Sequence, residues 1–134
     1  MPNRADLEIE YLASMSTFHT AWNLSHNMVK FEPGDTALIA GASSAVAQVS
    51  FAYLRSLGVK PFSTMMLGRS NHAQFVDNVK AMGCWSCVTY SYARSNYMSR
   101  LISDVPAPKA YFNHVGGPLG SSLFRLMGEN GTVV

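Results

Sequence analysis

Residues 36–48 read Thr36-Ala37-Leu38-Ile39-Ala40-Gly41-Ala42-Ser43-Ser44-Ala45-Val46-Ala47-Gln48. The run 36–40 is apolar and short enough for a buried strand, and Gly41 ends it with a turn. A helix is predicted over 45–56 because apolar residues cover much of its circumference, and Gly58 stops it. A buried strand, a turn of small residues and a helix in this order indicate an α/β domain.

The same pattern recurs along the chain. Upstream, we predict a helix that places Ala21, Leu24 and Met28 on one face and ends near Lys30. Thr17 and Thr20 are its candidate N-caps. Residues 31–35, which follow it, are predicted as a turn. Downstream, we predict strands over 62–66, 88–89, 109–115 and 131–134, and helices over 71–82, 96–103 and 119–127. This alternation predicts a Rossmann-like, doubly wound parallel sheet with helices on both faces, truncated at the C-terminus. Its ligand site is expected at the carboxyl ends of the strands.

Composition narrows the classes of protein to consider. The chain has 134 residues, 48% of them hydrophobic and 13% charged, which suits one packed domain. Its net charge of +2 comes from 10 basic and 8 acidic side chains without a block of one sign, so we expect no nucleic-acid partner. Its apolar runs are far shorter than the roughly 20 residues that cross a bilayer, so we expect a soluble protein without membrane insertion.

Cys84-Trp85-Ser86-Cys87 has the spacing of zinc knuckles and redox dithiols. A structural zinc site needs about four ligands, and no second cysteine pair or histidine cluster accompanies this one. A redox site would open a helix after a strand, whereas this pair precedes a β-rich stretch. We therefore expect two reduced, partly buried thiols and no metal site.

Residues 41–48 form the turn in which a phosphate-binding site is expected. In doubly wound folds a pyrophosphate sits on the free amides at the N-terminus of the helix that follows the first strand. The three positions of the glycine fingerprint fall here on Ala42, Ser44 and Ala47, whose small side chains still permit close approach. Ser43 and Ser44 would add hydroxyl donors. The alternative is a strand–helix turn of small residues without a ligand.

The end of the second strand bears on which dinucleotide binds. Enzymes that use NAD place an acidic residue there for the ribose 2′-hydroxyl, whereas 66–70 is Met-Leu-Gly-Arg-Ser and contains no acid. Arg69 offers a guanidinium suited to a phosphate. The stretch therefore favours NADP(H), unless Arg69 is only a solvated loop residue.

Four stretches together resemble a known family: residues 20–22, 31–35, 40–48 and 106–117. They are similar to the cofactor-binding half of the zinc-independent medium-chain dehydrogenases/reductases, most of all to the 2-enoyl thioester reductases of mitochondrial fatty-acid biosynthesis. Quinone reductases are near relatives of these enzymes.

The resemblance implies roles for individual residues. Those at the pyrophosphate would be Ser43, Ser44, Ala45 and Val46. Arg69 would meet the adenosine 2′-phosphate, Thr20 would approach the nicotinamide or its phosphate, and the residues bordering the nicotinamide would be Val115, Gly116 and Gly117. The sequence departs from the family pattern at Ala47, at Leu67 in place of a second arginine, and at Thr17-Phe18 in place of Asn-Pro.

The resemblance also implies how the chain is organised. Residues 1–30 would join a missing catalytic domain that supplies a tyrosine proton donor, and residues 31–134 would be an incomplete NADP-binding domain. No catalytic residue is expected in this chain, which alone would be inactive. The parent protein would be an NADPH-dependent oxidoreductase that acts on 2-enoyl-CoA or acyl-carrier-protein thioesters. Its compartment would be the mitochondrion or, alternatively, the cytoplasm. It could form a homodimer through its edge strand.

Two other readings stay open, and a third is disfavoured. A quinone or alkenal reductase would use the same cofactor domain, and a non-catalytic nucleotide-binding module would have lost the fingerprint at Ala42 and Ala47. A methyltransferase of similar fold lacks support, because no acidic residue ends the second strand.

Overall fold

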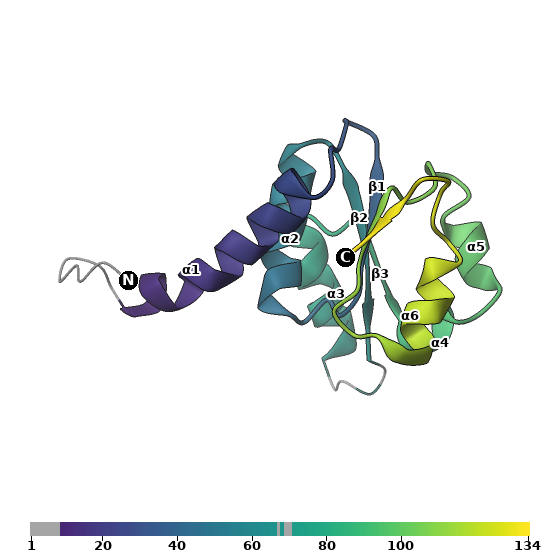
Figure 1. The fold of residues 1–134 in the computed structure, drawn as a ribbon. Helices are drawn as coiled ribbons and strands as arrows, with labels where there is room; N and C mark the ends of the chain where they lie inside the picture. The colour runs from purple at the N-terminus through teal and green to yellow at the C-terminus, as the bar shows by residue number, and fades with distance from the viewer. Residues whose placement is uncertain (1–8, 67, 69–70) are drawn as a thin grey trace.

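The structure is a computed structural model that describes residues 9–66, 68 and 71–134. Its centre is a five-stranded sheet in which every neighbouring pair is parallel, in the order β3-β2-β1-β4-β5 (Figure 1). The strands are β1 (Thr36–Ile39), β2 (Lys60–Met65), β3 (Ser86–Thr89), β4 (Ala110–Phe112) and β5 (Thr132–Val133). The predicted doubly wound parallel sheet is confirmed.

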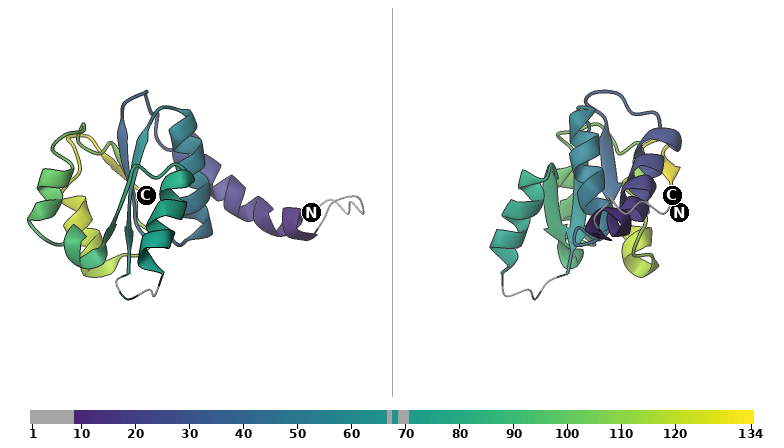
Figure 2. Two further views of the ribbon diagram at one scale, coloured as in Figure 1. Left: turned by 180° about the vertical axis from the view of Figure 1, so that it is seen from behind. Right: turned by 90° about the vertical axis from the view of Figure 1, so that its left-hand side faces the viewer.

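Helices cover both faces of the sheet (Figures 1 and 2). One face carries the π-helix η1 (Asn23–Asn27), α2 (Ala45–Ser56) and α3 (His72–Ala81), and on this side α1 (Ile9–Trp22) packs against α2 and extends away from the sheet. The other carries α4 (Tyr90–Ala93), α5 (Tyr97–Leu101) and α6 (Gly117–Phe124). Each face of the sheet has its own hydrophobic core. Strand β1 contributes side chains to both, because Ile39 belongs to one core and Leu38 to the other. A sheet covered on both sides explains why every residue of β1 is buried and three of the four are apolar.

The first helix differs from its prediction. Within the described residues it runs from Ile9 to Trp22, so Thr17 and Thr20 lie inside α1 and do not cap a helix. Ala21 and Leu24 are buried as expected, but Met28 is 56% exposed and Val29 is buried instead. A π-helix has more residues per turn than an α-helix, so the next buried position after η1 falls on Val29 instead of Met28. A periodicity of about 3.6 residues does not predict this shift.

Other boundaries also moved. The helix predicted over 96–103 ends at Leu101, and a separate helix, α4, precedes it, with Thr89 Oγ1 accepting from Tyr92 N at 3.3 Å as its cap. Strand β4 stops at Phe112 rather than at residue 115, and α6 begins at Gly117 with Pro118 in its first turn. The bounds predicted for α2 are confirmed.

Cys84 and Cys87 are free thiols. Cys84 is buried, and its Sγ donates to the carbonyl oxygen of Ser86 at 3.2 Å. Burial raises the pKa of Cys84 to about 12 and that of Cys87 to about 11, so both stay protonated near neutral pH. Protonated thiols are poor nucleophiles and poor metal ligands. The described residues contain no group of three or more His, Cys, Asp or Glu placed to hold a metal ion, and none of their helices is long and apolar enough to cross a membrane.

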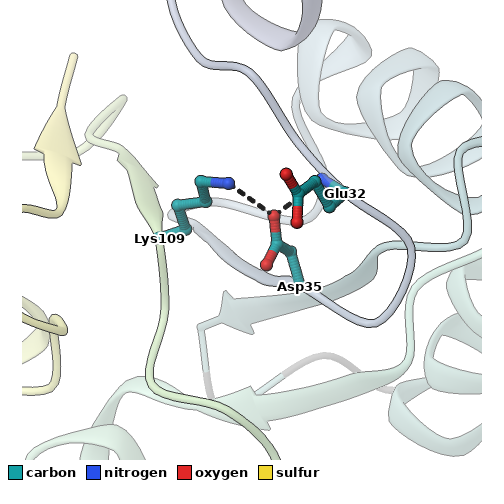
Figure 3. Close-up of polar contacts among 3 residues, drawn as sticks. All are labelled: Glu32, Asp35 and Lys109. Carbon is teal, nitrogen blue, oxygen red and sulfur yellow. Dashed lines mark hydrogen bonds and ion pairs between the residues drawn. The ribbon is translucent and has the colours of Figure 1, made fainter.

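The predicted turn at 31–35 is present and ties three strands together where they begin. Asp35 Oδ2 accepts from the Glu32 amide at 2.7 Å and from Lys109 Nζ at 2.9 Å (Figure 3). The Asp35 carbonyl oxygen accepts from Lys60 N at 2.8 Å, at the start of β2. Since Lys109 directly precedes β4, one aspartate links the loop before β1 to the strands on either side of it.

Replacing Asp35 with alanine should lower the free energy of unfolding by about 1–3 kcal/mol, because the carboxylate accepts two hydrogen bonds that alanine cannot replace. Lys109→Met keeps the bond to Glu32 and removes an ion pair whose lysine is 39% exposed, so it should cost less than about 1 kcal/mol. Urea unfolding of both variants measures the difference. Equal losses, or no loss for Asp35→Ala, would show that this turn does not clamp the strands.

Candidate functional site

The strand order places a topological switch point at the carboxyl ends of the strands, and the region between the two turns that meet there is called the crevice below. Strand β1 lies between β2 and β4; the helix that follows β1 covers one face, and the helix that follows β4 covers the other. Ligands of doubly wound sheets bind where successive connections leave in opposite directions, at the carboxyl ends of the strands. Here that point lies between the turn after β1 and the turn after β4.

The turn after β1 is held by both neighbouring strands. Ala40 N donates to Phe112 O at 3.0 Å and Ala42 N donates to Thr64 O at 2.8 Å. Gly41 N donates to Thr64 Oγ1 at 3.3 Å, and the positive φ of Gly41, 79°, is one that a side chain would strain. The turn therefore leaves the sheet in a fixed direction.

The N-terminus of α2 presents backbone donors that no described residue accepts from. Its first helical bond runs from Gln48 N to Ser44 O at 3.1 Å, so the amides of Ala45, Val46 and Ala47 have no acceptor within the helix. The side chain of Ser44, the N-cap residue, makes no capping bond to these amides. Free amides and the positive end of the helix dipole together favour an anion at this position.

Small residues allow α2 to lie close to the sheet. Ala42 and Ala47, at two of the three fingerprint positions, are both completely buried in the core on this face. A larger side chain at either position would have to displace its neighbours. Close packing of this helix, for which the fingerprint commonly has glycine, is achieved here with alanine.

The turn after β4 uses two glycines in conformations that other residues rarely adopt. Gly116 has φ 69° and ψ −160°, and Gly117 has φ 61°. Gly116 N donates to Asn113 Oδ1 at 2.8 Å. A Cβ placed on Gly41 would lie 3.3 Å from Val115 Cγ2, so the two turns are in van der Waals reach of each other.

The structure thus brings seven of the nine predicted site residues to one edge: Ser43, Ser44, Ala45, Val46, Val115, Gly116 and Gly117. Thr20 is exposed on α1, where its hydroxyl donates to Ser16 O at 2.8 Å, and no contact joins it to either turn within the described residues. Arg69 lies outside the described residues.

The prediction gave no role to two residues that shape the site. Thr64 is 2% exposed, yet its hydroxyl and its carbonyl oxygen both accept from the turn after β1. A polar residue at a buried position of a strand was the available signal. Asn113 lies in the stretch 106–117 that carries the family resemblance, and its side chain accepts a hydrogen bond from the turn after β4.

Two of the hollows formed by the described residues lie away from both turns. One of 480 Å³, near the amino ends of β2 and β3, is lined by residues that include Arg55, Lys60, Lys80 and Trp85. The other, of 340 Å³ between α1 and α2, is apolar and is lined by Met15, Phe18, His19, Trp22, Val49 and Tyr53. Neither includes a residue of the two turns.

Comparison with known proteins gives consistent relatives, although no protein-family model matches the chain. The mitochondrial enoyl-[acyl-carrier-protein] reductase of Dictyostelium discoideum is 34% identical over 135 residues, which cover 97% of this chain and 37% of the relative. The human enzyme of the same name is 25% identical over 86% of this chain and 31% of its own length. The chain therefore spans about a third of the length of the curated relatives it matches.

Solved structures agree with these relatives. The mitochondrial 2-enoyl thioester reductase Etr1p/Etr2p heterodimer from Candida tropicalis superposes with a TM-score of 0.86 at 25% identity, over 95% of this chain and 36% of that one. The Escherichia coli quinone oxidoreductase complexed with NADPH has a TM-score of 0.77 at 18% identity over 97% of this chain and 39% of that one, which shows a shared fold. The chain therefore has the cofactor-domain fold of the medium-chain dehydrogenase/reductase family, and within that family its relatives in sequence are the mitochondrial enoyl-[acyl-carrier-protein] reductases.

Proposed function

We propose that this chain is the NADP(H)-binding part of an oxidoreductase that reduces 2-enoyl thioesters of CoA or acyl carrier protein. The observation that carries the proposal is the row of amides at the start of α2 that lack an acceptor among the described residues, next to the turn after β4. The names of its relatives support the reaction, since they are enoyl-[acyl-carrier-protein] reductases.

The residues at the crevice suit a dinucleotide. The amides of Ala45 and Val46, with the hydroxyls of Ser43 and Ser44, would hold the pyrophosphate. Val115, Gly116 and Gly117 would border the nicotinamide half, because the turn after β4 lies across the crevice and has no side chains at the two glycines. The bound cofactor would supply a hydride, and this chain would bind and orient it.

Selection of NADP(H) over NAD(H) would follow from the segment after β2. Residues 66–70 contain no acid that would repel a 2′-phosphate, and they include Arg69. Met66, the first residue after β2, is 64% exposed, and β2 pairs directly with β1. Leu67 stands where the family often has a second arginine, so Arg69 would carry most of the discrimination.

The catalytic groups would come from another part of the protein, with residues 1–30 leading to it. Large apolar side chains along α1 are exposed: Ile9, Tyr11, Met15, Phe18 and Trp22 are between 44% and 80% accessible. A helix this apolar is normally covered. The relatives are almost three times as long as the matched segment, and a domain formed by the remainder would cover α1 and complete the cleft.

The edge strand suggests how the protein assembles. Strand β5 pairs only with β4 among the described residues, and Val133 is 43% exposed. An open strand edge offers unpaired backbone groups to another chain. We infer that the protein can form a homodimer along this edge, and that its compartment is mitochondrial, as the names of its relatives indicate.

Ala45→Pro tests the pyrophosphate site directly. Ala45 is the first residue of α2, where proline is favoured, and Ser44 before it has φ −67° and ψ 137°, which suits a residue preceding proline. The variant should fold with unchanged thermal stability but bind NADPH roughly 10-fold to 100-fold more weakly, since it lacks one amide that would donate to a charged phosphate. Fluorescence titration of NADPH measures this. Ala45→Gly keeps the amide and serves as the control; wild-type affinity in Ala45→Pro would refute the site.

Arg69→Ala tests cofactor selection. Loss of a charge-assisted contact to the 2′-phosphate should weaken NADPH binding roughly tenfold or more and leave NADH binding unchanged. Arg94→Ala, which removes an equal charge next to α4, is the matched control and should change neither affinity. Equal weakening for both nucleotides would mean that Arg69 does not recognise the 2′-phosphate.

The isolated 134-residue chain should bind NADPH yet fail to reduce crotonyl-CoA. Hydride transfer requires a substrate held against the nicotinamide and shielded from water, and half a cleft provides neither. Absorbance at the NADPH band, followed with and without crotonyl-CoA, measures turnover. Sustained NADPH oxidation that depends on crotonyl-CoA would show that the chain needs no further domain.

A further inference from the structure

Asn113 connects three parts of the fold just beyond β4. Its backbone amide donates to Val134 O at 2.8 Å, next to β5. Its side-chain Oδ1 accepts two hydrogen bonds, from the hydroxyl of Tyr111 at 2.9 Å and from the amide of Gly116 at 2.8 Å. One carboxamide oxygen is therefore shared by a strand residue and by the turn that follows the strand.

The strand side of this arrangement is rigid. Tyr111 is 1% exposed and belongs to the core beneath α4, α5 and α6. Burial raises the pKa of Tyr111, so its hydroxyl keeps its proton and acts as a donor. Asn113 itself is exposed, so its side-chain oxygen links the buried Tyr111 to the surface turn that follows β4.

The other side is a turn that has little rigidity of its own. Gly116 and Gly117 both adopt positive φ, and two adjacent glycines have wide backbone freedom without an external restraint. The bond from Gly116 N to Asn113 Oδ1 restrains the turn on one side, and Gly120 N donates to Gly116 O at 3.1 Å on the other.

The side-chain carboxamide of Asn113 packs closely between β4 and α6. A Cβ on Gly120 would lie 3.4 Å from both Asn113 Oδ1 and Asn113 Nδ2, and 3.6 Å from the Tyr111 hydroxyl oxygen. The absence of a side chain at Gly120 lets α6 approach this group closely. Position 113 thus governs both the path of the turn and the start of α6.

We propose that Asn113 is a positioning residue for the nicotinamide half of the cofactor: its Oδ1 holds the Gly116–Gly117 turn in the shape that borders the reactive ring. The inference rests on the proposed function, since it assumes that the crevice binds NADP(H). Asn113 acts through the turn and needs no contact with the cofactor. Its effect is therefore confined to one half of the dinucleotide.

The experiment compares two ligands on the 134-residue chain: NADPH, and 2′,5′-ADP, which lacks the nicotinamide half. Asn113→Leu and Asn113→Ala remove the acceptor, and both are made so that the test does not depend on one of them folding. Asn113→Asp keeps an acceptor oxygen. Tyr111→Phe removes one donor and leaves the bond to Gly116, so it is the control. Affinities are measured by calorimetry and folding by thermal unfolding.

We expect the two acceptor-free variants to bind NADPH roughly threefold to tenfold more weakly and 2′,5′-ADP within about twofold of wild type. Asn113→Asp should restore much of the NADPH affinity. Unchanged NADPH binding in both acceptor-free variants, or an equal loss for the two ligands, would overturn the inference and leave the proposed function standing. Failure of the wild-type chain to bind either ligand would instead overturn the proposed function, and this inference with it.

Discussion

The parallel pairing of β1 with β2 on one side and β4 on the other is the constraint on which the rest of the structure depends. Leu38 stands opposite Phe62 in one pairing and opposite Tyr111 in the other. The pairing continues past the strand, because Ala40 donates to Phe112 and Ala42 donates to Thr64. Both neighbours therefore fix the turn at Gly41, and the turn fixes where α2 begins.

Burial on both faces makes this placement stable enough to serve a binding site. Phe51 and Leu54 of α2 are completely buried against one face of the sheet, and truncating a buried Phe or Leu typically costs about 2–5 kcal/mol. A single amide–phosphate hydrogen bond contributes about 1.5–3 kcal/mol. The packing of α2 is therefore strong enough to hold its free amides in place against ligand and solvent.

Sequence patterns predicted the structural features that residues close together in the chain determine. The bounds of α2 agree with the prediction because Gly41 and Gly58 delimit it, and the donors of Ser43 to Val46 could be placed because they belong to one continuous turn. The π-turn of η1 and the early end of β4 were missed, since the first departs from helical periodicity and the second accompanies a turn in which Asn113 Oδ1 accepts from Gly116 N. The role of Thr64 required its contact with Gly41, 23 residues away. Such contacts exist only after the sheet has formed.

The central claim is that the turns after β1 and β4 form one dinucleotide site, and backbone amide NMR tests it most directly. Titration of the ¹⁵N-labelled chain with NADP⁺ should shift the amide signals of residues 41–47 most strongly, together with those of Gly116 and Gly117. The signals of Lys60, Lys80 and Trp85, which line the basic hollow near the opposite ends of β2 and β3, should stay unchanged. Shifts centred on that hollow, or no saturable shift at millimolar NADP⁺, would contradict the account.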